Sequence, residues 1–263
     1  MRRPQGWGVG IPPETLPGTW AGQAVLDLLQ PAWFYNWQPD PVGERAGSVF
    51  VPMVWDGTLD TRHASRLEDH PGETWLFMNE PERPEQANTD PATAADLTRD
   101  FLRMAWDEGG EFQWCAPGVA VNMDDHDGLA WATEYVQDIR RRGISRPSYW
   151  HVHCYRSTTA AQFWQGWGNW RLWYEVWGVG APVVISEVCA VAASYANQTA
   201  VMLAVDSLLQ SGEVTAAAWF SSHKSDVSQW PQSTLTTIDA VAQTVALTPL
   251  GQHFVGLALY PPA

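Results

Sequence analysis

Two glutamates end apolar, strand-like runs of the chain, and their positions make them candidates for chemistry. Glu80 lies in WLFMNEPE at residues 75–82, and Glu187 lies in PVVISEV at residues 182–188. A buried strand normally stops at a turn residue, so a carboxylate there indicates a site rather than a packing need. Two carboxylates over one cleft suit glycoside hydrolysis, in which one protonates the departing oxygen and the other attacks the sugar carbon or activates water. The alternative is a pair of structural carboxylates bound to arginine or to backbone amides.

The elements that must position these glutamates are eight apolar, β-rich runs with helical segments between them. Helical periodicity is clearest in residues 90–108, 127–143 and 194–212, and a final helix is expected over 247–257. Alternation of strands and helices predicts parallel pairing, and eight units predict closure. We therefore expect a single-domain α/β fold, a (β/α)8 TIM barrel over residues 1–263. The eight predicted strands are residues 6–9, 32–37, 48–55, 74–81, 111–117, 148–155, 182–188 and 216–222.

In such a barrel the reactive groups lie at the carboxyl ends of the strands. Because side chains alternate along a strand, Glu80 should share a face with Leu76 and Met78, and Glu187 with Val183 and Ile185. Both glutamates would then point toward the barrel axis. Three βα units separate them, which places their strands across the mouth from each other. The short segment 38–47 leaves no room for a full helix, and the first strand is weak.

The composition of the chain indicates which classes of ligand the protein can bind. The chain has 15 Lys and Arg against 29 Asp and Glu, a formal net charge of −14. This charge argues against nucleic acid and against an anionic membrane, and favours a neutral or cationic ligand. Seventeen tryptophans are present, and these rings stack on sugar faces as well as filling cores. We expect several of them to line a groove.

The cysteines and the N-terminal residues indicate in which cellular compartment the protein is expected. Cys115, Cys154 and Cys189 each fall inside a predicted strand, and an odd, sparse count favours buried free thiols over a disulfide framework. The start MRRPQGWGVG lacks the apolar run of a signal peptide. We expect an extracellular location if a leader has been removed and a cytoplasmic one otherwise, and we expect a monomer.

Several segments in order resemble one known family. WFYNW, FVPMVW, NEPE, HVHCY, VVISEV and LTPLGQHF together resemble glycoside hydrolase family 128, the Asl1-like catalytic domain of endo-β-1,3-glucanases, over roughly residues 7–257. NEP and the later SE are also similar to clan A, the retaining (β/α)8 glycoside hydrolases with catalytic glutamates on strands four and seven. The resemblance implies an endo-acting β-1,3-glucanase that binds a polysaccharide or oligosaccharide.

The resemblance also implies roles for particular residues. Glu80 would be the general acid/base and Glu187 the nucleophile, with carboxyl groups about 5–5.5 Å apart for a retaining mechanism. Glu80 must hold its proton while Glu187 stays ionised. Asn79 would contact the sugar 2-hydroxyl, although an asparagine before proline is also a common turn residue. Tyr155 could donate to Glu187, and His153 would contact substrate beside it.

Aromatic and polar residues near the strand ends complete the expected substrate site. By resemblance, Trp219 would form the platform under the sugar being cleaved. Tyr35 and Asn36 could supply hydrogen bonds near the glycone side. For every tryptophan, packing between barrel and helices is the competing interpretation. Tryptophans expected near the mouth are Trp33, Trp37, Trp55 and Trp219.

Three alternatives remain open at the level of sequence. His151 and His153 fall on one side of a strand, as in a metal pair, but their own element supplies neither a carboxylate nor a third histidine at ligand spacing. We therefore expect no metal and no cofactor. A clan A enzyme acting on another β-glucan or on mannan would share every catalytic feature, and a non-catalytic glycan-binding barrel would share the aromatic groove.

Overall fold

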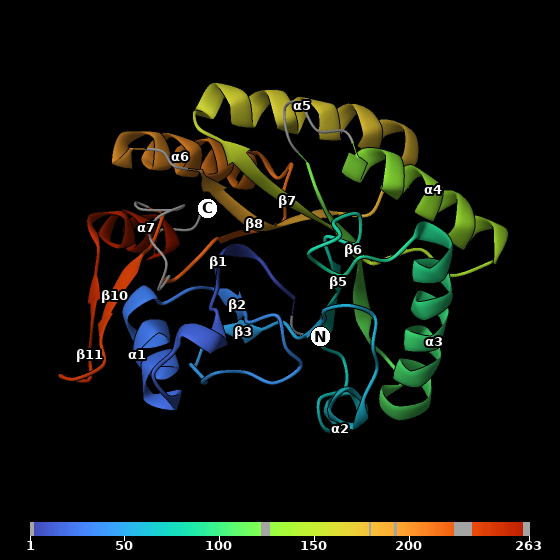
Figure 1. Ribbon diagram of the computed structural model, residues 1–263, viewed down its shortest axis with the longest axis horizontal. Helices are drawn as coiled ribbons and strands as arrows, with labels where there is room; N and C mark the ends of the chain where they lie inside the picture. Colours follow the sequence, from blue (N-terminus) through green and yellow to red (C-terminus); the bar gives the residue numbers. More distant parts are fainter. Residues whose placement is uncertain (1–2, 122–126, 179, 192–193, 224–232, 260–263) are drawn as a thin grey trace.

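Parallel strands form the inner wall of the molecule, and helices surround them (Figure 1). The computed structural model describes residues 3–121, 127–178, 180–191, 194–223 and 233–259. The strand order is β3-β2-β1-β9-β8-β7-β6-β5-β4, and each neighbouring pair is parallel. These strands are β1 (Gly6–Gly10), β2 (Trp33–Tyr35), β3 (Val49–Phe50), β4 (Met53–Val54), β5 (Thr74–Asn79), β6 (Gln113–Ala120), β7 (Trp150–Ser157), β8 (Val183–Ala190) and β9 (Ala216–Trp219).

The barrel closes through the short strands at the two ends of this order. β3 and β4 lie within the single predicted strand 48–55, separated only by Val51 and Pro52. The Val51 N–H donates to Phe34 on β2, and the Pro52 carbonyl accepts from Leu76 on β5. One strand therefore changes partner at its middle, and β3 and β4 together take the place of the single predicted strand, so all eight predicted strands are present. We call residues 49–54 the seam.

The strands separate two apolar layers, one inside the barrel and one between the strands and the helices. The interior layer consists of Trp33, Tyr35, Val51, Met53, Leu76, Cys115, Tyr149, Val184, Ala216 and Ala218. The outer layer lies between strands and helices and contains Val183, Ile185, Trp150 and Trp219. Small Ala residues of β9 face large rings of β2 within the interior layer, as expected for a filled barrel core.

Helices follow most strands. They are α1 (Thr19–Leu29), α2 (Thr61–Asp69), α3 (Pro91–Gly109), α4 (Asp127–Arg141), α5 (Ala160–Trp177), α6 (Tyr195–Ser211) and α7 (Pro249–Leu259), with a short 3-10 helix, η1 (Pro13–Thr15), before α1. Asp90, Thr159 and Ser194 accept backbone N–H groups at the starts of α3, α5 and α6. Gly212 ends α6 in a left-handed conformation, as glycine after a helix allows.

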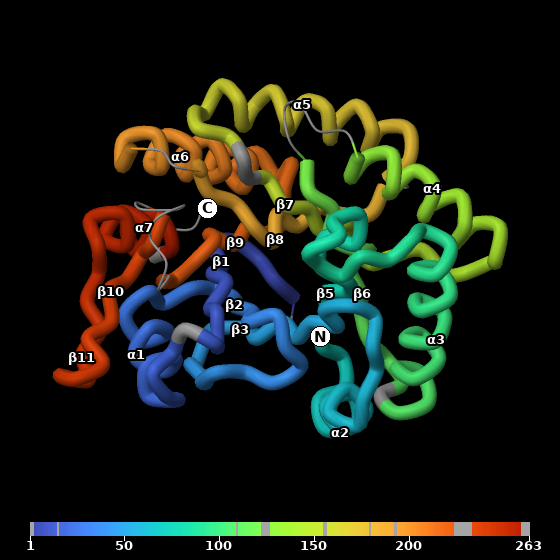
Figure 2. Tube along the Cα trace, in the orientation of Figure 1, coloured from blue at the N-terminus to red at the C-terminus, as the bar shows by residue number. Residues whose placement is uncertain are grey.

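One sector of the barrel differs from the others. Residues 36–48, between β2 and β3, contain no helix, as the short predicted link requires. Figure 2 shows this segment as an extended loop between α1 and α2. Residues 244–247, partly expected in the last helix, instead form β11 (Thr244–Leu247), which pairs with β10 (Thr236–Asp239) in an antiparallel hairpin. The final helix therefore starts at Pro249.

Cys115, Cys154 and Cys189 are buried free thiols, as predicted. None of the helices in the described part of the chain has the length and apolar character needed to span a bilayer.

Candidate active site

Both candidate glutamates follow irregular points in their strands. On β5 the pairing with β6 passes from Phe77 to Asn79, so Met78 is skipped and adopts φ +55°; Glu80 follows at φ +43°. On β8 the pairing with β7 passes from Ile185 to Glu187. Such bulges re-aim side chains at the ends of strands. The expected strict alternation is therefore wrong in part, because Met78, Val183 and Ile185 belong to the outer layer while both glutamates face inward.

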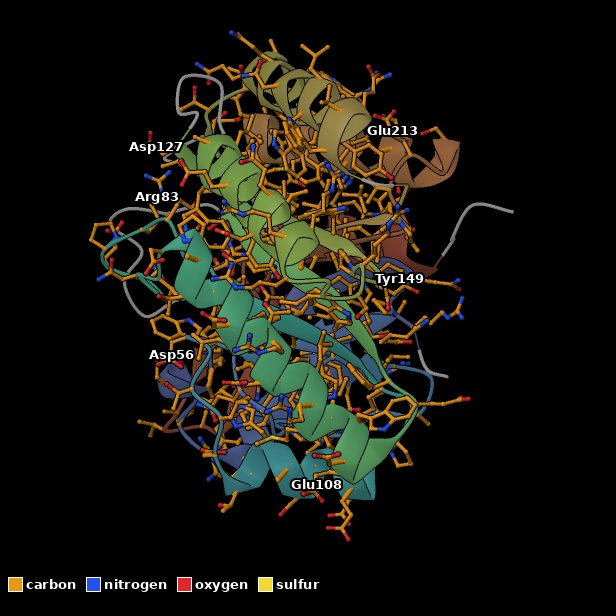
Figure 3. The ribbon with its side chains drawn as sticks, turned by 90° about the vertical axis from the view of Figure 1, so that its right-hand side faces the viewer. Asp56, Arg83, Glu108, Asp127, Tyr149 and Glu213 are labelled. Atoms are coloured by element: carbon orange, nitrogen blue, oxygen red, sulfur yellow. The ribbon has the colours of Figure 1, made fainter. Side chains whose placement is uncertain are left out.

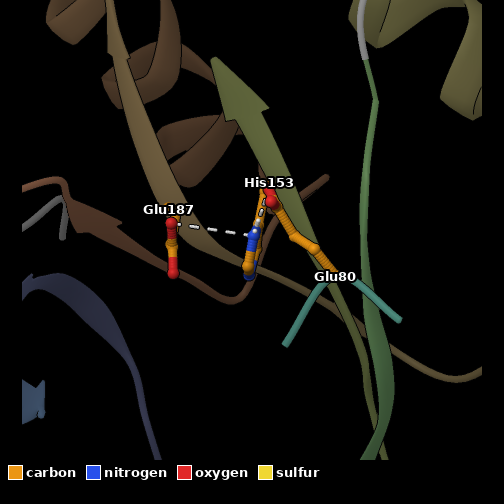
Figure 4. A group of neighbouring side chains, drawn as sticks. All are labelled: Glu80, His153 and Glu187. Carbon is orange, nitrogen blue, oxygen red and sulfur yellow. Dashed lines mark hydrogen bonds and ion pairs between the residues drawn. The ribbon is translucent and has the colours of Figure 1, made fainter. Parts of the chain in front are cut away.

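The two glutamates meet at His153 on β7, which lies between their strands (Figure 4). Its Nδ1 is 3.0 Å from Glu80 Oε1 and 3.6 Å from Glu187 Oε2. One ligand atom from each of the three residues lies within 4.8 Å of the others, and all three side chains are buried. Burial by itself lowers the pKa of His153, but the charge of Glu187 and the hydrogen bond to Glu80 outweigh it, so that the pKa is raised.

A second histidine supports this arrangement from below. The His151 ring lies 5.9 Å from the His153 ring, with Nδ1 2.9 Å from Ser186 Oγ and Nε2 3.2 Å from the Phe77 carbonyl. Burial lowers its pKa to about 3, so the ring is neutral, donating to Phe77 and accepting from Ser186. Gly118 makes room for it, because a Cβ there would lie 2.2 Å from the ring. His151 is therefore a hydrogen-bonded histidine of the barrel interior that supports His153.

Two aromatic residues at the end of β2, Tyr35 and Trp37, lie beside Glu187. The Trp37 indole N–H donates to Glu187 Oε1 at 2.8 Å, and the Trp37 ring lies 4.7 Å from Tyr35 and 5.8 Å from Phe220. Burial raises the pKa of Tyr35, and the charge of Glu187 raises it further, so its hydroxyl keeps its proton. Charge-assisted hydrogen bonding by Trp37 favours the ionised form of Glu187.

Asn79 and Glu82 flank Glu80 within the strand end. The Asn79 side-chain amide donates to Gln86 Oε1 at 3.0 Å, while its Oδ1 has no hydrogen-bond partner among the described residues. Glu82, which was not singled out from the sequence, also has a buried side chain, and its Oε1 accepts the Ala120 N–H at 2.8 Å. The sequence signal was the second acid of NEPE, directly after the proline.

Other predicted site residues are distributed between the mouth and the core. Trp37 and Trp55 are half-buried and line one cavity of about 300 Å³, together with Asp56, Thr58 and His63. Figure 3 shows Asp56, Arg83 and Asp127, which follow β4, β5 and β6, at one end of the molecule, opposite Tyr149 and Glu213, which precede β7 and β9. The glutamates therefore belong to the end where the carboxyl ends of the strands gather.

The structure corrects the expected substrate contacts of Trp219 and Trp33. Trp219 is fully buried in the outer layer, where its N–H donates to Ser233, because alternation along β9 turns Ala218 inward and Trp219 outward. Phe220, the next residue, is the ring that lies against Trp37. Trp33 is fully buried in the interior layer, beneath Tyr35.

Four further residues of the expected substrate site are buried or have side chains outside the described residues. Asn36 is buried and donates to the Asp40 carbonyl, so it shapes the 36–48 loop. Tyr35 and His153 are fully buried and face the glutamates, and their expected contacts with substrate stay predictions. The backbone of Tyr155 lies in β7, but its side chain is outside the described residues.

The three-residue group also has the chemistry of a metal site, since two carboxylates and one imidazole bind divalent cations. Sequence reasoning considered a His151 and His153 pair instead, and His151 has both ring nitrogens engaged elsewhere. The expectation that the chain needs no metal stays a prediction.

A closed parallel barrel with two buried glutamates converging at the carboxyl ends of its strands is the scaffold and site of a glycoside hydrolase. The comparisons with known proteins agree with this class. The chain belongs to the glycosyl hydrolase catalytic core family, whose model matches residues 26–254. No curated protein matches the chain.

Solved structures of similar fold cover nearly the whole chain. A family 128 subgroup I endo-β-1,3-glucanase variant from Amycolatopsis mediterranei, in complex with laminaripentaose, is 24% identical, with a TM-score of 0.75 over 96% of this chain and 99% of that one. A subgroup II endo-β-1,3-glucanase from Sorangium cellulosum is 23% identical, with a TM-score of 0.71 over 96% and 98%. A subgroup III curdlan-specific exo-β-1,3-glucanase from Blastomyces gilchristii is 19% identical, with a TM-score of 0.70 over 95% and 97%.

Proposed function

We propose that this glycoside hydrolase cleaves β-1,3-glucan within the chain and retains anomeric configuration, using Glu187 as nucleophile and Glu80 as general acid/base. The observation that carries the mechanism is the convergence of the two carboxylates within 4.8 Å beside His153. A retaining enzyme needs its carboxyl groups about 5–5.5 Å apart, whereas an inverting one needs about 6.5–9.5 Å to admit a water.

The reaction then proceeds in two displacements. Glu187 attacks the anomeric carbon while Glu80 gives its proton to the departing glycosidic oxygen, forming a glycosyl ester on Glu187. Glu80, now ionised, takes a proton from water as that water attacks the same carbon and releases Glu187. The N–H of Trp37 holds Glu187 ionised before the attack. Asn79 Oδ1 accepts the sugar 2-hydroxyl, a bond that strengthens as positive charge develops on the ring.

Support for the substrate comes from the similar structures. The Amycolatopsis enzymes are described as endo-β-1,3-glucanases and were crystallised with laminaritriose, laminaripentaose and laminarihexaose. A half-buried pair, Trp37 and Trp55, lines one cavity and can stack on a neutral sugar chain, and the hydrogen bond from Trp37 to Glu187 joins this cavity to the carboxylates. We expect the enzyme to act as a monomer, which size-exclusion chromatography with light scattering will test.

The decisive experiment compares Glu187→Ala and Glu80→Ala on laminarin and on an aryl laminaribioside with a dinitrophenolate leaving group. Glu187→Ala should abolish turnover of both, and azide should restore cleavage with inverted product. Glu80→Ala should lose laminarin hydrolysis but still form the glycosyl ester from the aryl substrate, because that leaving group needs no proton. Retained laminarin hydrolysis in either folded variant would contradict the assignment.

A panel of soluble polysaccharides tests linkage. Cleavage of laminarin with a mixture of oligosaccharide products supports internal β-1,3 cleavage, and release of glucose alone indicates exo action. Preference for a β-1,4-glucan, a mixed-linkage glucan or mannan would contradict the proposed substrate but not the proposed mechanism. Binding of laminari-oligosaccharides without release of reducing ends would indicate a non-catalytic barrel.

A further inference from the structure

Glu82 occupies an unusual place for a carboxylate. Its side chain is only 2% exposed, although the residue follows Glu80 by two positions at the end of β5. Pro81 has no N–H, so the β5–β6 backbone pairing cannot continue past Glu80, whose N–H donates to Gly118 at 2.8 Å. The carboxylate of Glu82 takes the next acceptor position, receiving the Ala120 N–H at 2.8 Å. A side chain thus extends the pairing that fixes the turn around Glu80.

Three charged groups of the described residues lie near Glu82. Glu80 and His153 both interact with it electrostatically, and Arg83 Nε lies 3.7 Å from Glu82 Oε1. Glu82 Oε2 is buried and has no hydrogen-bond partner among the described residues. Glu82 is therefore a buried carboxyl group with one oxygen satisfied and a like charge beside it.

These surroundings make Glu82 hold a proton unusually well. Burial raises its pKa to about 7, and the charge of Glu80 adds to this, while the Ala120 N–H and His153 act in the opposite direction. Two neighbouring buried carboxyl groups titrate as a coupled pair, so the charge of each favours the protonated form of the other.

The acid role of Glu80 creates a need for such a neighbour. His153, 3.0 Å away and with a raised pKa, favours the ionised form of Glu80, which is the wrong form for protonating a leaving group. A negative charge at Glu82 acts on Glu80 in the opposite direction. The turn therefore carries, two residues from the acid, a group whose charge offsets that of the histidine.

We propose that Glu82 is a positioning residue of the reaction: it holds the turn that carries Glu80 and, by its negative charge, keeps the proton of Glu80 in place as pH rises. This inference rests on the proposed function, because it assumes that Glu80 is the acid. Its sign follows from the coupling of the two carboxyl groups. Wherever Glu82 is ionised, its charge opposes ionisation of Glu80, so Glu80 retains its proton further into the alkaline range than it would alone.

The test is the pH profile of kcat/KM for laminarihexaose with Glu82→Gln. Glutamine keeps an oxygen acceptor for the Ala120 N–H but never carries charge, so the alkaline limb should move to lower pH by about half a unit or more. The matched control is Glu85→Gln, which removes a charge from an exposed position of the same loop and should leave the limb in place. An unshifted profile in Glu82→Gln, or an equal shift in Glu85→Gln, would overturn the charge role.

A second measurement needs no variant of Glu82. In wild-type protein carrying ¹³C in its glutamate carboxyl groups, the Glu80 resonance, assigned with Glu80→Gln, should titrate in two steps, the second near the midpoint of Glu82. A single step would refute the coupling even if Glu82→Gln failed to fold. Failure of the proposed function looks different: Glu80→Ala would then hydrolyse laminarin, whatever the profile of Glu82→Gln.

Discussion

At the scale of single residues, the site depends on which groups hold Glu187 in its ionised form. Trp37 provides the hydrogen bond at 2.8 Å, and it does so from a backbone with φ +59°, a conformation that side-chain-bearing residues seldom adopt. Gly10 makes this possible, since a Cβ there would lie 2.8 Å from the Trp37 ring. The indole is thus directed at the carboxylate by the local backbone and by its glycine neighbour.

We expect Trp37→Phe to lower kcat/KM for laminarihexaose roughly 10- to 100-fold, because a hydrogen bond to a charged group contributes about 1.5–3 kcal/mol. Phenylalanine keeps an aromatic face for the sugar, so the loss should fall mainly on kcat. The matched control is Trp164→Phe, at an exposed position on α5. An unchanged kcat in Trp37→Phe would show that this N–H is not needed to keep Glu187 ionised.

At the scale of elements, an aromatic column links the floor of the barrel to its mouth. Trp33, Tyr35 and Trp37 project successively from β2 and its extension, with ring centroids 6.0 Å and 4.7 Å apart. On the opposite side of the interior, His151 and His153 rise along β7 in the same way. Both columns depend on glycines that leave space for rings.

The space at Gly118 yields an element-scale prediction. Gly118→Ala should destabilise the protein by about 1–3 kcal/mol, because its Cβ would lie 2.2 Å from the His151 ring and must displace it or β6. Gly168→Ala is the control: it lies within α5 with no atom near its Cβ, so alanine should stabilise by about 0.5–1 kcal/mol. Urea unfolding measures both, and a neutral Gly118→Ala would contradict the packing argument.

At the scale of the whole molecule, a buried ion pair braces the side of the barrel that lacks a helix. Arg66 on α2 donates to both carboxylate oxygens of Glu73, just before β5, at 2.9 and 2.7 Å. Its guanidinium also lies 4.8 Å from the ring centroid of Phe50 in β3. One side chain thus connects α2, β5 and the seam.

We expect Arg66→Met to lower global stability by about 3–5 kcal/mol, since it leaves the Glu73 carboxylate buried without its partner. Arg62→Met breaks the exposed pair with Asp60 and should cost about 0–1 kcal/mol. Thermal unfolding of both variants at neutral pH makes the comparison. Equal losses would mean that the buried pair contributes no more than a surface one.

The sequence was sufficient to predict the architecture, but not to predict every residue that lies around the two carboxylates. Alternation of strand and helix patterns predicted eight units, and carboxylates at two strand ends predicted Glu80 and Glu187 as candidates. Strict alternation could not foresee the bulges at Met78 and Ser186, because a skipped residue leaves no mark in apolar periodicity. For Trp219, alternation along β9 would have been the better guide. Alternation assigns Trp219 to the outer layer, where it lies, whereas the resemblance to a family predicted that it contacts the sugar.

The seam has a consequence for how a long polymer reaches the carboxylates. At Pro52 the wall changes partner, and residues 36–48 supply no helix behind it. Trp37 and Trp55, the two rings of the mouth cavity, stem from strand ends on either side of this junction. Breathing motions of the barrel should concentrate there, and amide hydrogens of residues 49–54 should exchange sooner than those of β7 and β8. If the seam opens in this way, we expect the two indoles to move apart, so that a polymer chain can enter between them from the side as well as by its end.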